Sequence, residues 1–228
     1  SVYVKNLLSF VPSTLFTSLN WYFSGMKLRN KILVLFAHPA MHKSRVNRRL
    51  IDSIKDIEDV AVHDLYEKYP DFHIDVNREQ QLLLEHDIIV WQHPFYWYSS
   101  PSLLKEWIDL VLQHGFAYGK SGTALRGKQV LTAITTGGRR EVYQDAAMNE
   151  FSIPQFLAPF DRTARLCNMD YLPPFVVHGT HLLNEEEMDA AALNYRSLLI
   201  SLRDELFSMD EIMECYYLND LLTKSEKH

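Results

Sequence analysis

The feature that most constrains the fold is a series of short apolar runs that alternate with helical patterns along the chain. Residues 31–37 (KILVLFA) form a continuous apolar, β-rich run, which is typical of a parallel strand buried on both faces. Further strands are predicted over 60–65, 88–92, 129–135 and 175–178. Because helical patterns separate these runs, the sequence predicts an α/β fold with a parallel sheet covered on both faces.

The segments between the strands carry apolar residues at helical spacing. Ser44 is suited to the N-cap of the first helix, and Pro101 to the first turn of a later one. Right-handed crossovers then bring the loops after the strands to one edge of the sheet, where ligands bind in folds of this class. The helices are predicted over 44–57, 77–85, 101–112, 153–167 and 185–207.

Length and hydrophobic content predict one domain. The chain has 228 residues, of which 47% are hydrophobic, enough for a large core. Residues 27–207 are expected to form the domain, with an N-terminal extension over 1–26 and a charged C-terminal tail over 208–228. The extension is interrupted by polar residues and proline, so it fits neither a membrane span nor a secretory signal. Either it packs on the domain, or Met26 is the natural start.

Charge and composition narrow the classes of partner. Acidic residues outnumber basic ones by 29 to 23, for a net charge of −6, which argues against nucleic-acid binding. The two cysteines, Cys167 and Cys215, form no metal or redox motif, and such sparse usage predicts a reducing, cytoplasmic location. The ten histidines include no three at metal-ligand spacing, so no metal site is expected.

The loop after the first predicted strand carries groups that bind anions. It leads into a helix whose first amide groups lack intrahelical partners and attract phosphate. His38, Ser44, Arg45 and Asn47 add a ring N–H, a hydroxyl, a charge and an amide. No Walker glycine pattern is present, so the loop suits one phosphate better than a triphosphate. Taken alone, it is more simply explained as an ordinary capped helix start.

Two further strand-end loops have properties that a flat cofactor requires. Residues 93–101 (HPFYWYSSP) place four successive aromatic side chains in a loop, where they cannot all enter one core. Residues 135–138 (TTGG) offer hydroxyls, amides and a backbone that a ring can approach closely. Together with the anion-binding loop they predict FMN, and FAD is less favoured because no adenosine site is evident.

Five strings along the chain carry a resemblance to a known family. They are FAHPAMHKSRVN (36–47), LYEKYPDFHID (65–75), WQHPFYWYSSPSLLKEWID (91–109), HGFAYG (114–119) and TTGG (135–138). The sequence resembles the NAD(P)H:quinone oxidoreductases of flavodoxin-like fold, especially the bacterial branch with the ancillary flavoproteins of glutathione-gated Kef potassium-efflux systems. The resemblance covers about residues 31–183. It implies a three-layer flavodoxin-like sandwich with a five-stranded parallel sheet in the order 2-1-3-4-5.

The resemblance also implies which residues hold the cofactor. FMN is the implied cofactor, NAD(P)H the co-substrate and a quinone-type compound the acceptor. The implied FMN contacts are His38, Ser44, Arg45, Val46 and Asn47 at the phosphate, and Pro94, Phe95, Tyr96, Trp97, Thr135, Thr136, Gly137 and Gly138 at the isoalloxazine.

Catalytic roles are implied for Tyr143 and for the backbone N–H groups of Gly137 and Gly138, which would stabilise charge on the reduced flavin. A packed aromatic residue at a helix start is an equal alternative for Tyr143. Asn149 stands where the better-known quinone reductases have a histidine that partners this tyrosine, which argues against a Tyr–His relay.

The implied substrate pocket contains Tyr98, Tyr118 and Lys120. Tyr118 matches a residue that the second subunit supplies, so the resemblance implies a homodimer. Lys120 replaces an aromatic residue of those relatives and gives the pocket mouth a positive charge, so the identity of the acceptor does not transfer from them.

Two other functions remain open at the level of sequence. The first is a regulatory ancillary subunit that docks on a membrane potassium-efflux antiporter, at the inner face of the cell membrane, with reductase activity secondary. The string at 65–75 especially favours that branch. The second is a one-electron flavodoxin-like carrier, which the acidic charge favours and the HGFAYG string does not.

Overall fold

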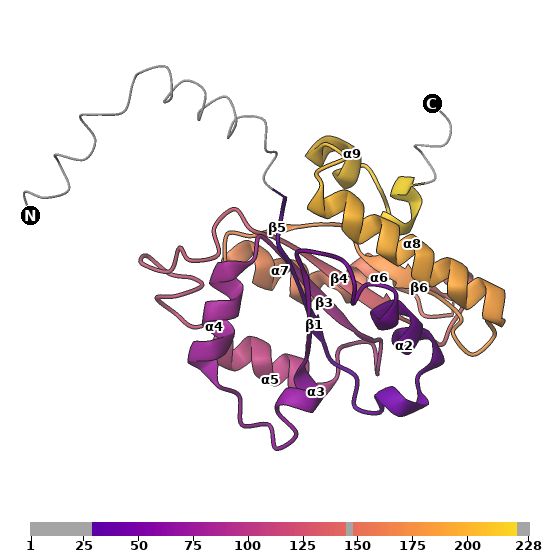
Figure 1. Ribbon diagram of the computed structural model, residues 1–228, viewed down its shortest axis with the longest axis horizontal. Helices are drawn as coiled ribbons and strands as arrows, with labels where there is room; N and C mark the ends of the chain where they lie inside the picture. Colours follow the sequence, from indigo (N-terminus) through magenta and orange to yellow (C-terminus); the bar gives the residue numbers. More distant parts are fainter. Residues whose placement is uncertain (1–28, 145–147, 223–228) are drawn as a thin grey trace, which may run out of the picture.

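The chain folds around a parallel sheet that lies between two layers of helices (Figure 1). The computed structural model describes residues 29–144 and 148–222, and the predicted extension over 1–26 lies outside them. The central strand β1 (Ile32–Phe36) pairs with β2 (Val60–Asp64) and β3 (Ile88–Pro94), and β3 pairs with β4 (Gln129–Thr135). The strand order is β2-β1-β3-β4-β5, with β6 also on β4, which confirms the predicted flavodoxin-like order.

The far edge of the sheet has two short strands where one was predicted. β5 (Asp170–Tyr171) and β6 (Phe175–Val177) both pair in parallel with β4. Pro173 and Pro174 lie between them. Because proline has no N–H to donate to the ladder, the edge strand is interrupted there and the sheet gains a sixth strand.

The two helical layers bury opposite faces of the sheet. One hydrophobic core lies under α2 (Arg45–Asp52) and α8 (Glu185–Arg203). The other lies under α3 (Leu65–Lys68), α4 (Val76–Glu85), α5 (Ser102–Val111), α6 (Ile153–Phe156) and α7 (Ala158–Leu166). Helices on both faces explain why β1 and β3 are buried along their whole length.

The helix predicted over 153–167 is divided into α6 and α7, with Leu157 between them. Pro159 cannot donate a hydrogen bond to the carbonyl of Gln155, four residues earlier, so a continuous helix would lack a bond there. α8 also ends earlier than predicted, at Arg203 rather than residue 207.

The C-terminal tail predicted over 208–228 is wrong for the part that the structure describes. α9 (Met209–Met213) and the 3₁₀ helix η4 (Leu218–Asp220) fold back against α8 and β6 (Figure 1). Ile212 and Leu218 are buried in the same core as α8, and Asn219 bonds both the N–H and the C=O of Val176, at 2.8 and 2.9 Å. Its apolar side chains make this segment part of the domain, although its charge predicted a solvated tail.

A buried carboxylate connects elements of the helical layer formed by α3 to α7, which we call the second layer. Glu79 on α4 is fully buried and accepts hydrogen bonds from Tyr69 Oη at 2.6 Å and Trp107 Nε1 at 2.7 Å. His63 Nε2 on β2 lies 2.9 Å from the same carboxylate. Burial alone would raise the pKa of Glu79, but these hydrogen bonds outweigh it and lower the pKa. One side chain thus connects β2, α4, α5 and the loop after α3.

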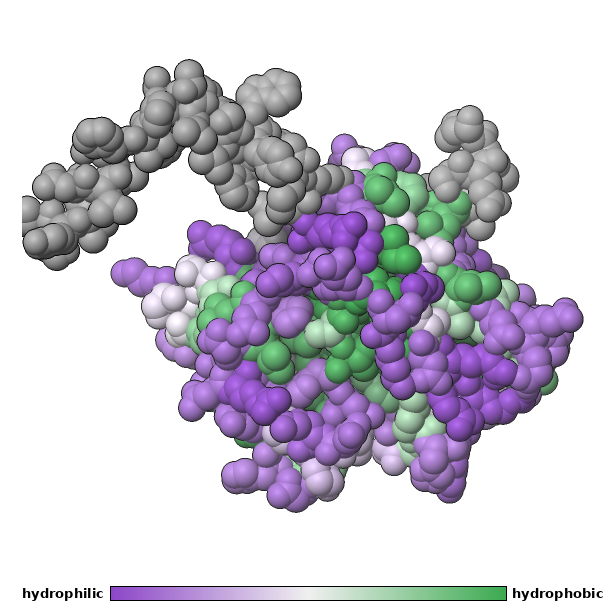
Figure 2. Space-filling view, viewed as in Figure 1, coloured by the Kyte–Doolittle hydropathy of each residue, from purple (hydrophilic) through white to green (hydrophobic). Residues whose placement is uncertain are grey.

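The surface view agrees with this layered arrangement. In Figure 2 hydrophobic residues show in the middle of the molecule, between the two groups of helices, and hydrophilic residues predominate around them. Across 29–144 and 148–222, the helices are too short or too polar to cross a bilayer.

Candidate functional site

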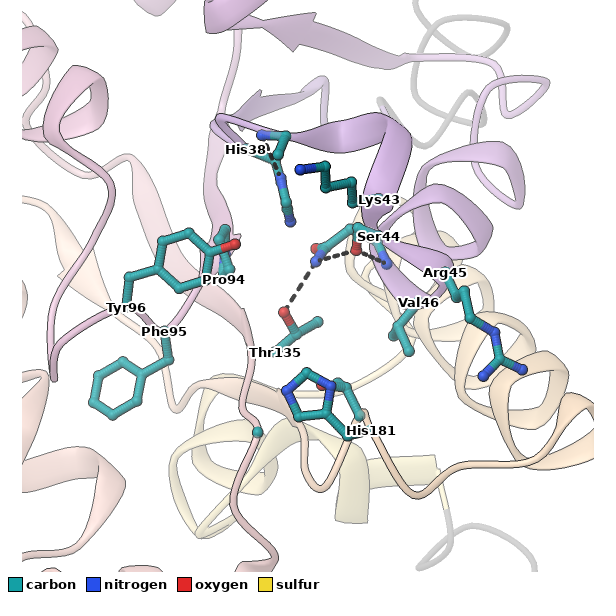
Figure 3. A pocket seen from close by; sticks show the side chains of 14 residues that line it. His38, Lys43, Ser44, Arg45, Val46, Pro94, Phe95, Tyr96, Thr135 and His181 are labelled. Carbon is teal, nitrogen blue, oxygen red and sulfur yellow. Dashed lines mark hydrogen bonds between the residues drawn. The ribbon is translucent and has the colours of Figure 1, made fainter.

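A cavity of about 550 Å³ opens at the carboxyl ends of β1, β3 and β4 (Figure 3). Parallel strands with the order found here bring these loops together at the point where the chain reverses its direction across the sheet. The cavity is lined by His38, Ala40, Lys43, Ser44, Arg45, Val46, Asn47, Pro94, Phe95, Tyr96, Thr135, Gly137, Thr180 and His181.

The start of α2 forms one end of the cavity. Ser44 is the N-cap, and its Oγ accepts hydrogen bonds from Asn47 N at 3.2 Å and Asn47 Nδ2 at 3.1 Å. Since both bonds use its lone pairs, the hydroxyl hydrogen of Ser44 remains available to a ligand. Asn47 Nδ2 also donates to Thr135 Oγ1 at 3.0 Å, which ties the helix start to the end of β4.

His38 adds a donor with a defined orientation. Its Nδ1 accepts a hydrogen bond from the N–H of Ala40 at 3.0 Å. Burial lowers the pKa of His38, so the ring is neutral at pH 7 and must carry its hydrogen on Nε2. An N–H of the ring, the hydroxyl of Ser44 and the first amides of α2 together form a donor set that suits the oxygens of one phosphate.

Both Lys43 and Arg45 line the cavity, but the guanidinium of Arg45 points away from its centre. Arg45 and Arg49 both pair with Glu185 at the start of α8, and in Figure 3 the guanidinium of Arg45 is directed away from the centre of the cavity. Lys43 lines the cavity on the same side as His38. Sequence reasoning selected Arg45 and missed Lys43, although both flank the N-cap.

An aromatic wall forms the opposite side. Phe95 and Tyr96 line the cavity, and the Phe95 ring contacts Tyr143 and Phe156, with centroids 6.0 and 5.6 Å apart. Trp97 does not line it: its side chain is 94% exposed, and its backbone has a φ of 49°. A positive φ is unusual for a bulky residue and turns the chain, so neighbouring aromatic side chains diverge.

The turn after β4 is shaped by contacts on the side away from the cavity. Gly137 lines the cavity, while Thr136 is buried behind it and donates from Oγ1 to the carbonyl of Gly138 at 2.8 Å. A Cβ on Gly138 would lie 2.8 Å from Val142 Cγ2 and 3.1 Å from Tyr143 Oη, so this glycine is required for close packing. Burial raises the pKa of Tyr143, which keeps its hydroxyl protonated at neutral pH.

The three residues predicted for the substrate pocket do not line this cavity. Tyr98 is half exposed and donates to Asn149 Oδ1 at 3.2 Å. Tyr118 and Lys120 lie in the loop between α5 and β4, which enters β4 at its amino end, and neither lines the cavity. Thr180 and His181, which sequence reasoning missed, do line it. They follow β6, so applying the strand-end rule to the last strand would have found them.

Among the residues described, no group of three or more histidine, cysteine or acidic side chains is arranged to hold a metal ion. The hydrogen-bond donors that line the cavity are instead hydroxyl, amide and ring N–H groups together with Lys43 and Arg45, a set suited to an anion beside an aromatic surface. Fold and cavity together define a doubly wound α/β protein whose cavity, lined by hydrogen-bond donors and aromatic side chains, lies at its topological switch point.

Comparisons with known proteins name the family. The family described as having a flavodoxin-like fold matches residues 30–199, and the chain belongs to it. A structure described as a thermophilic tryptophan halogenase from Streptomycin violaceusniger is 46% identical, covers 72% of this chain and 96% of its own, and has a TM-score of 0.71. General stress protein 14 from Treponema denticola, in complex with FMN, is 39% identical with coverages of 75% and 99% and a TM-score of 0.73. A protein from P. pentosaceus described as an NADPH-quinone reductase is 32% identical, with coverages of 73% and 96% and a TM-score of 0.68.

Proposed function

We propose that this protein is an FMN-dependent NAD(P)H:quinone oxidoreductase. The observation that carries the proposal is the donor set of Ser44, His38 and the first amides of α2, which faces an aromatic wall across one cavity. The T. denticola relative was solved with FMN, and the P. pentosaceus relative is described as an NADPH-quinone reductase. Both properties support a flavin cofactor and a nicotinamide nucleotide as donor.

FMN would supply the hydride chemistry when bound, and the chain's own residues would position it. Ser44, Asn47, His38 and Lys43 would hold the phosphate at the start of α2. Pro94, Phe95, Tyr96 and the backbone at Gly137 would line the ring and keep water from one side of it. The N–H groups at Gly137 and Gly138 and the protonated hydroxyl of Tyr143 are the donors proposed to stabilise negative charge there.

The absorbance spectrum of the purified protein after incubation with FMN and desalting tests this proposal. We expect bound yellow flavin that NADH or NADPH bleaches under anaerobic conditions, and whose colour a quinone restores. Asn47→Asp places a second anion beside the phosphate and should weaken FMN binding at least about tenfold, because two charges about 4 Å apart at a protein surface repel by several kcal/mol. Protein that never retains flavin would overturn the proposal. Bound flavin that neither nucleotide reduces would favour the one-electron carrier instead.

We further propose that the enzyme is a homodimer in which Tyr118 and Lys120 of one copy approach the cavity of the other. The support is that neither residue lines the cavity of its own chain, while the wall beside Tyr96 remains open to solvent. Sedimentation should give twice the monomer mass. Tyr118→Leu should raise the KM for the quinone and leave the FMN affinity unchanged. A monomer with full quinone turnover would contradict this arrangement.

The regulatory role on a potassium-efflux antiporter stays a prediction from sequence. The string at 65–75, which favoured that branch, has a packing role in the structure: Leu65, Tyr69 and Ile74 are buried, and Tyr69 binds the Glu79 carboxylate. Scoring flavin-site and surface variants separately for reductase turnover and potassium efflux tests it, because efflux that no surface variant alters would exclude docking.

A further inference from the structure

His178 follows β6 directly and packs between two tyrosines. Its ring lies 5.8 Å from the ring of Tyr143, at an angle of 36°, and 5.5 Å from the ring of Tyr217. Tyr217 comes from the C-terminal segment, beyond residues 30–199 where the family matches. The guanidinium of Arg140 lies 4.8 Å from the centre of the Tyr217 ring and 3.5 Å from Asp220, which holds this segment against the turn that carries Tyr143.

The hydrogen bonds around His178 define which ring nitrogen carries the hydrogen. Thr136 Oγ1 has one hydrogen and donates it to the carbonyl of Gly138 at 2.8 Å. Thr136 Oγ1 also lies 3.2 Å from His178 Nδ1, so in that contact the imidazole must be the donor. Burial lowers the pKa of His178 to about 4, and the neutral ring then has its hydrogen on Nδ1 and a lone pair on Nε2. Nε2 is buried and has no hydrogen-bond partner among the described residues.

This hydrogen bond is part of a larger set that fixes the turn facing the cavity. The carbonyl of Gly138 accepts a second bond from the N–H of Gly179 at 2.8 Å, and Thr180 N donates to Thr136 O at 3.0 Å. The segment after β6 therefore sets the direction of the peptide groups at 136–138. Because Gly137 lines the cavity, a rotation of these peptides would move the donors proposed to face the flavin.

We propose that His178 is a positioning residue: its Nδ1–H orients the Thr136 hydroxyl, which holds the turn 136–138, and its ring supports Tyr143. This rests on the proposed flavin function of the same cavity. Asn149, which the resemblance places where the better-known quinone reductases have a histidine, accepts a hydrogen bond from Tyr98 Oη. His178 is instead the histidine that contacts Tyr143, and it approaches from the C-terminal side of the sheet.

The flavin-free protein allows a direct test. In ¹⁵N spectra of the histidine side chains at pH 7, His178 should be neutral with its hydrogen on Nδ1, and Thr136→Val should change that preference because it removes the acceptor. A hydrogen on Nε2 in the wild type would overturn the proposal. This outcome does not depend on whether the protein binds FMN.

Variants of the flavin-loaded protein give the second test. Asparagine at position 178 keeps a donor near the place of Nδ1, whereas leucine removes it. We expect His178→Leu and Thr136→Val to lower kcat on the order of 10- to 100-fold and to shift the flavin's midpoint potential, with the nucleotide KM nearly unchanged. His178→Asn should recover most of the loss.

His86→Leu is the matched control, because it also removes a buried histidine hydrogen bond, from His86 Nδ1 to Leu82 O, at the amino end of β3. It should leave kcat and potential unaltered. If His178→Leu keeps wild-type turnover and potential in a protein that binds FMN, the positioning role fails while the proposed function stands. If the wild type never binds FMN, the proposed function is wrong. The ¹⁵N measurement of the His178 tautomer then still tests the hydrogen bond between His178 and Thr136.

Discussion

Ser44 acts both as a helix cap and as a donor at the cavity, and the two roles can be separated. Ser44→Ala removes the acceptor for Asn47 N and should lower the free energy of unfolding by about 1 kcal/mol. It also removes a hydroxyl from the proposed phosphate site, so FMN affinity should fall by about fivefold to tenfold, measured by fluorescence quenching of the flavin.

Ser208→Ala is the control for this prediction. Ser208 likewise caps α9 by accepting from the third helical N–H, that of Glu211, and does not line the cavity. It should cost similar stability and leave FMN binding intact. Equal FMN affinity in both variants would show that Ser44 is only a cap.

His93 is fully buried at the end of β3 and makes the stability of the fold depend on pH. Burial lowers the pKa of His93 to about 4, from the ordinary histidine value of 6.5. Between these values the unfolded chain binds a proton that the folded chain excludes, so the stability that neutral His93 provides is present above pH 6.5 and is lost as the pH falls towards 4. The loss amounts to at most about 1.4 kcal/mol per pH unit.

Urea unfolding at pH 7 and pH 5 measures this dependence. His93→Gln should reduce it but not abolish it, because glutamine does not titrate whereas buried His178 still does, and the exposed His73→Gln should leave it unchanged. An unchanged slope in His93→Gln would mean that other groups cause the acid sensitivity.

At the scale of elements, the second helical layer depends on one carboxylate. The Glu79 carboxylate accepts three hydrogen bonds, from partners on β2, on α5 and in the loop after α3. In Glu79→Gln the side-chain NH₂ group can only donate, so one of these partners loses its acceptor. We expect a loss of about 3 kcal/mol in the free energy of unfolding, measured by chemical denaturation. Glu85→Gln, exposed on the same helix, should cost almost nothing. Comparable losses in the two variants would exclude this role for Glu79.

Elements buried on both faces were the most predictable from sequence. The run of apolar residues at β1 and β3 has no other stable environment than a covered parallel sheet, so the strands and their order followed from the pattern and the resemblance. The breaks were not predicted, although Pro159 and Pro173 are visible in the sequence. Apolar residues continue through both positions, so their spacing does not show that the helix and the edge strand are interrupted there.

The sequence predicted those residues of the candidate site that lie at the ends of regular helices and strands. Ser44, Asn47 and Thr135 lie at ends of regular elements, whose positions the pattern determines. The side-chain directions of Arg45 and Trp97 depend instead on Glu185 at the start of α8 and on a positive φ in an irregular loop, respectively. Neither is encoded in local periodicity. Tyr118 was assigned to the substrate pocket from the resemblance, and it does not line the cavity of its own chain.

For the whole molecule, the last described segment completes the sheet. Asn219→Ala would leave the N–H and C=O of Val176 without their partners, and we expect the free energy of unfolding to fall by about 2 kcal/mol. Calorimetry or denaturant titration would measure it, with the exposed Asn77→Ala on α4 as control. A change of less than about 0.5 kcal/mol would mean that water replaces the side chain without cost.

The contact between Asn219 and Val176 also has a consequence for biosynthesis. A ribosome releases β6 well before residue 219 emerges, and during that interval the backbone of Val176 is an open strand edge that another nascent chain can join. The side-chain amide of Asn219 later occupies this edge by bonding the N–H and C=O of Val176. Chains that end at Tyr216, before the segment that carries Asn219, should therefore accumulate as aggregates, while chains that include this segment remain dispersed.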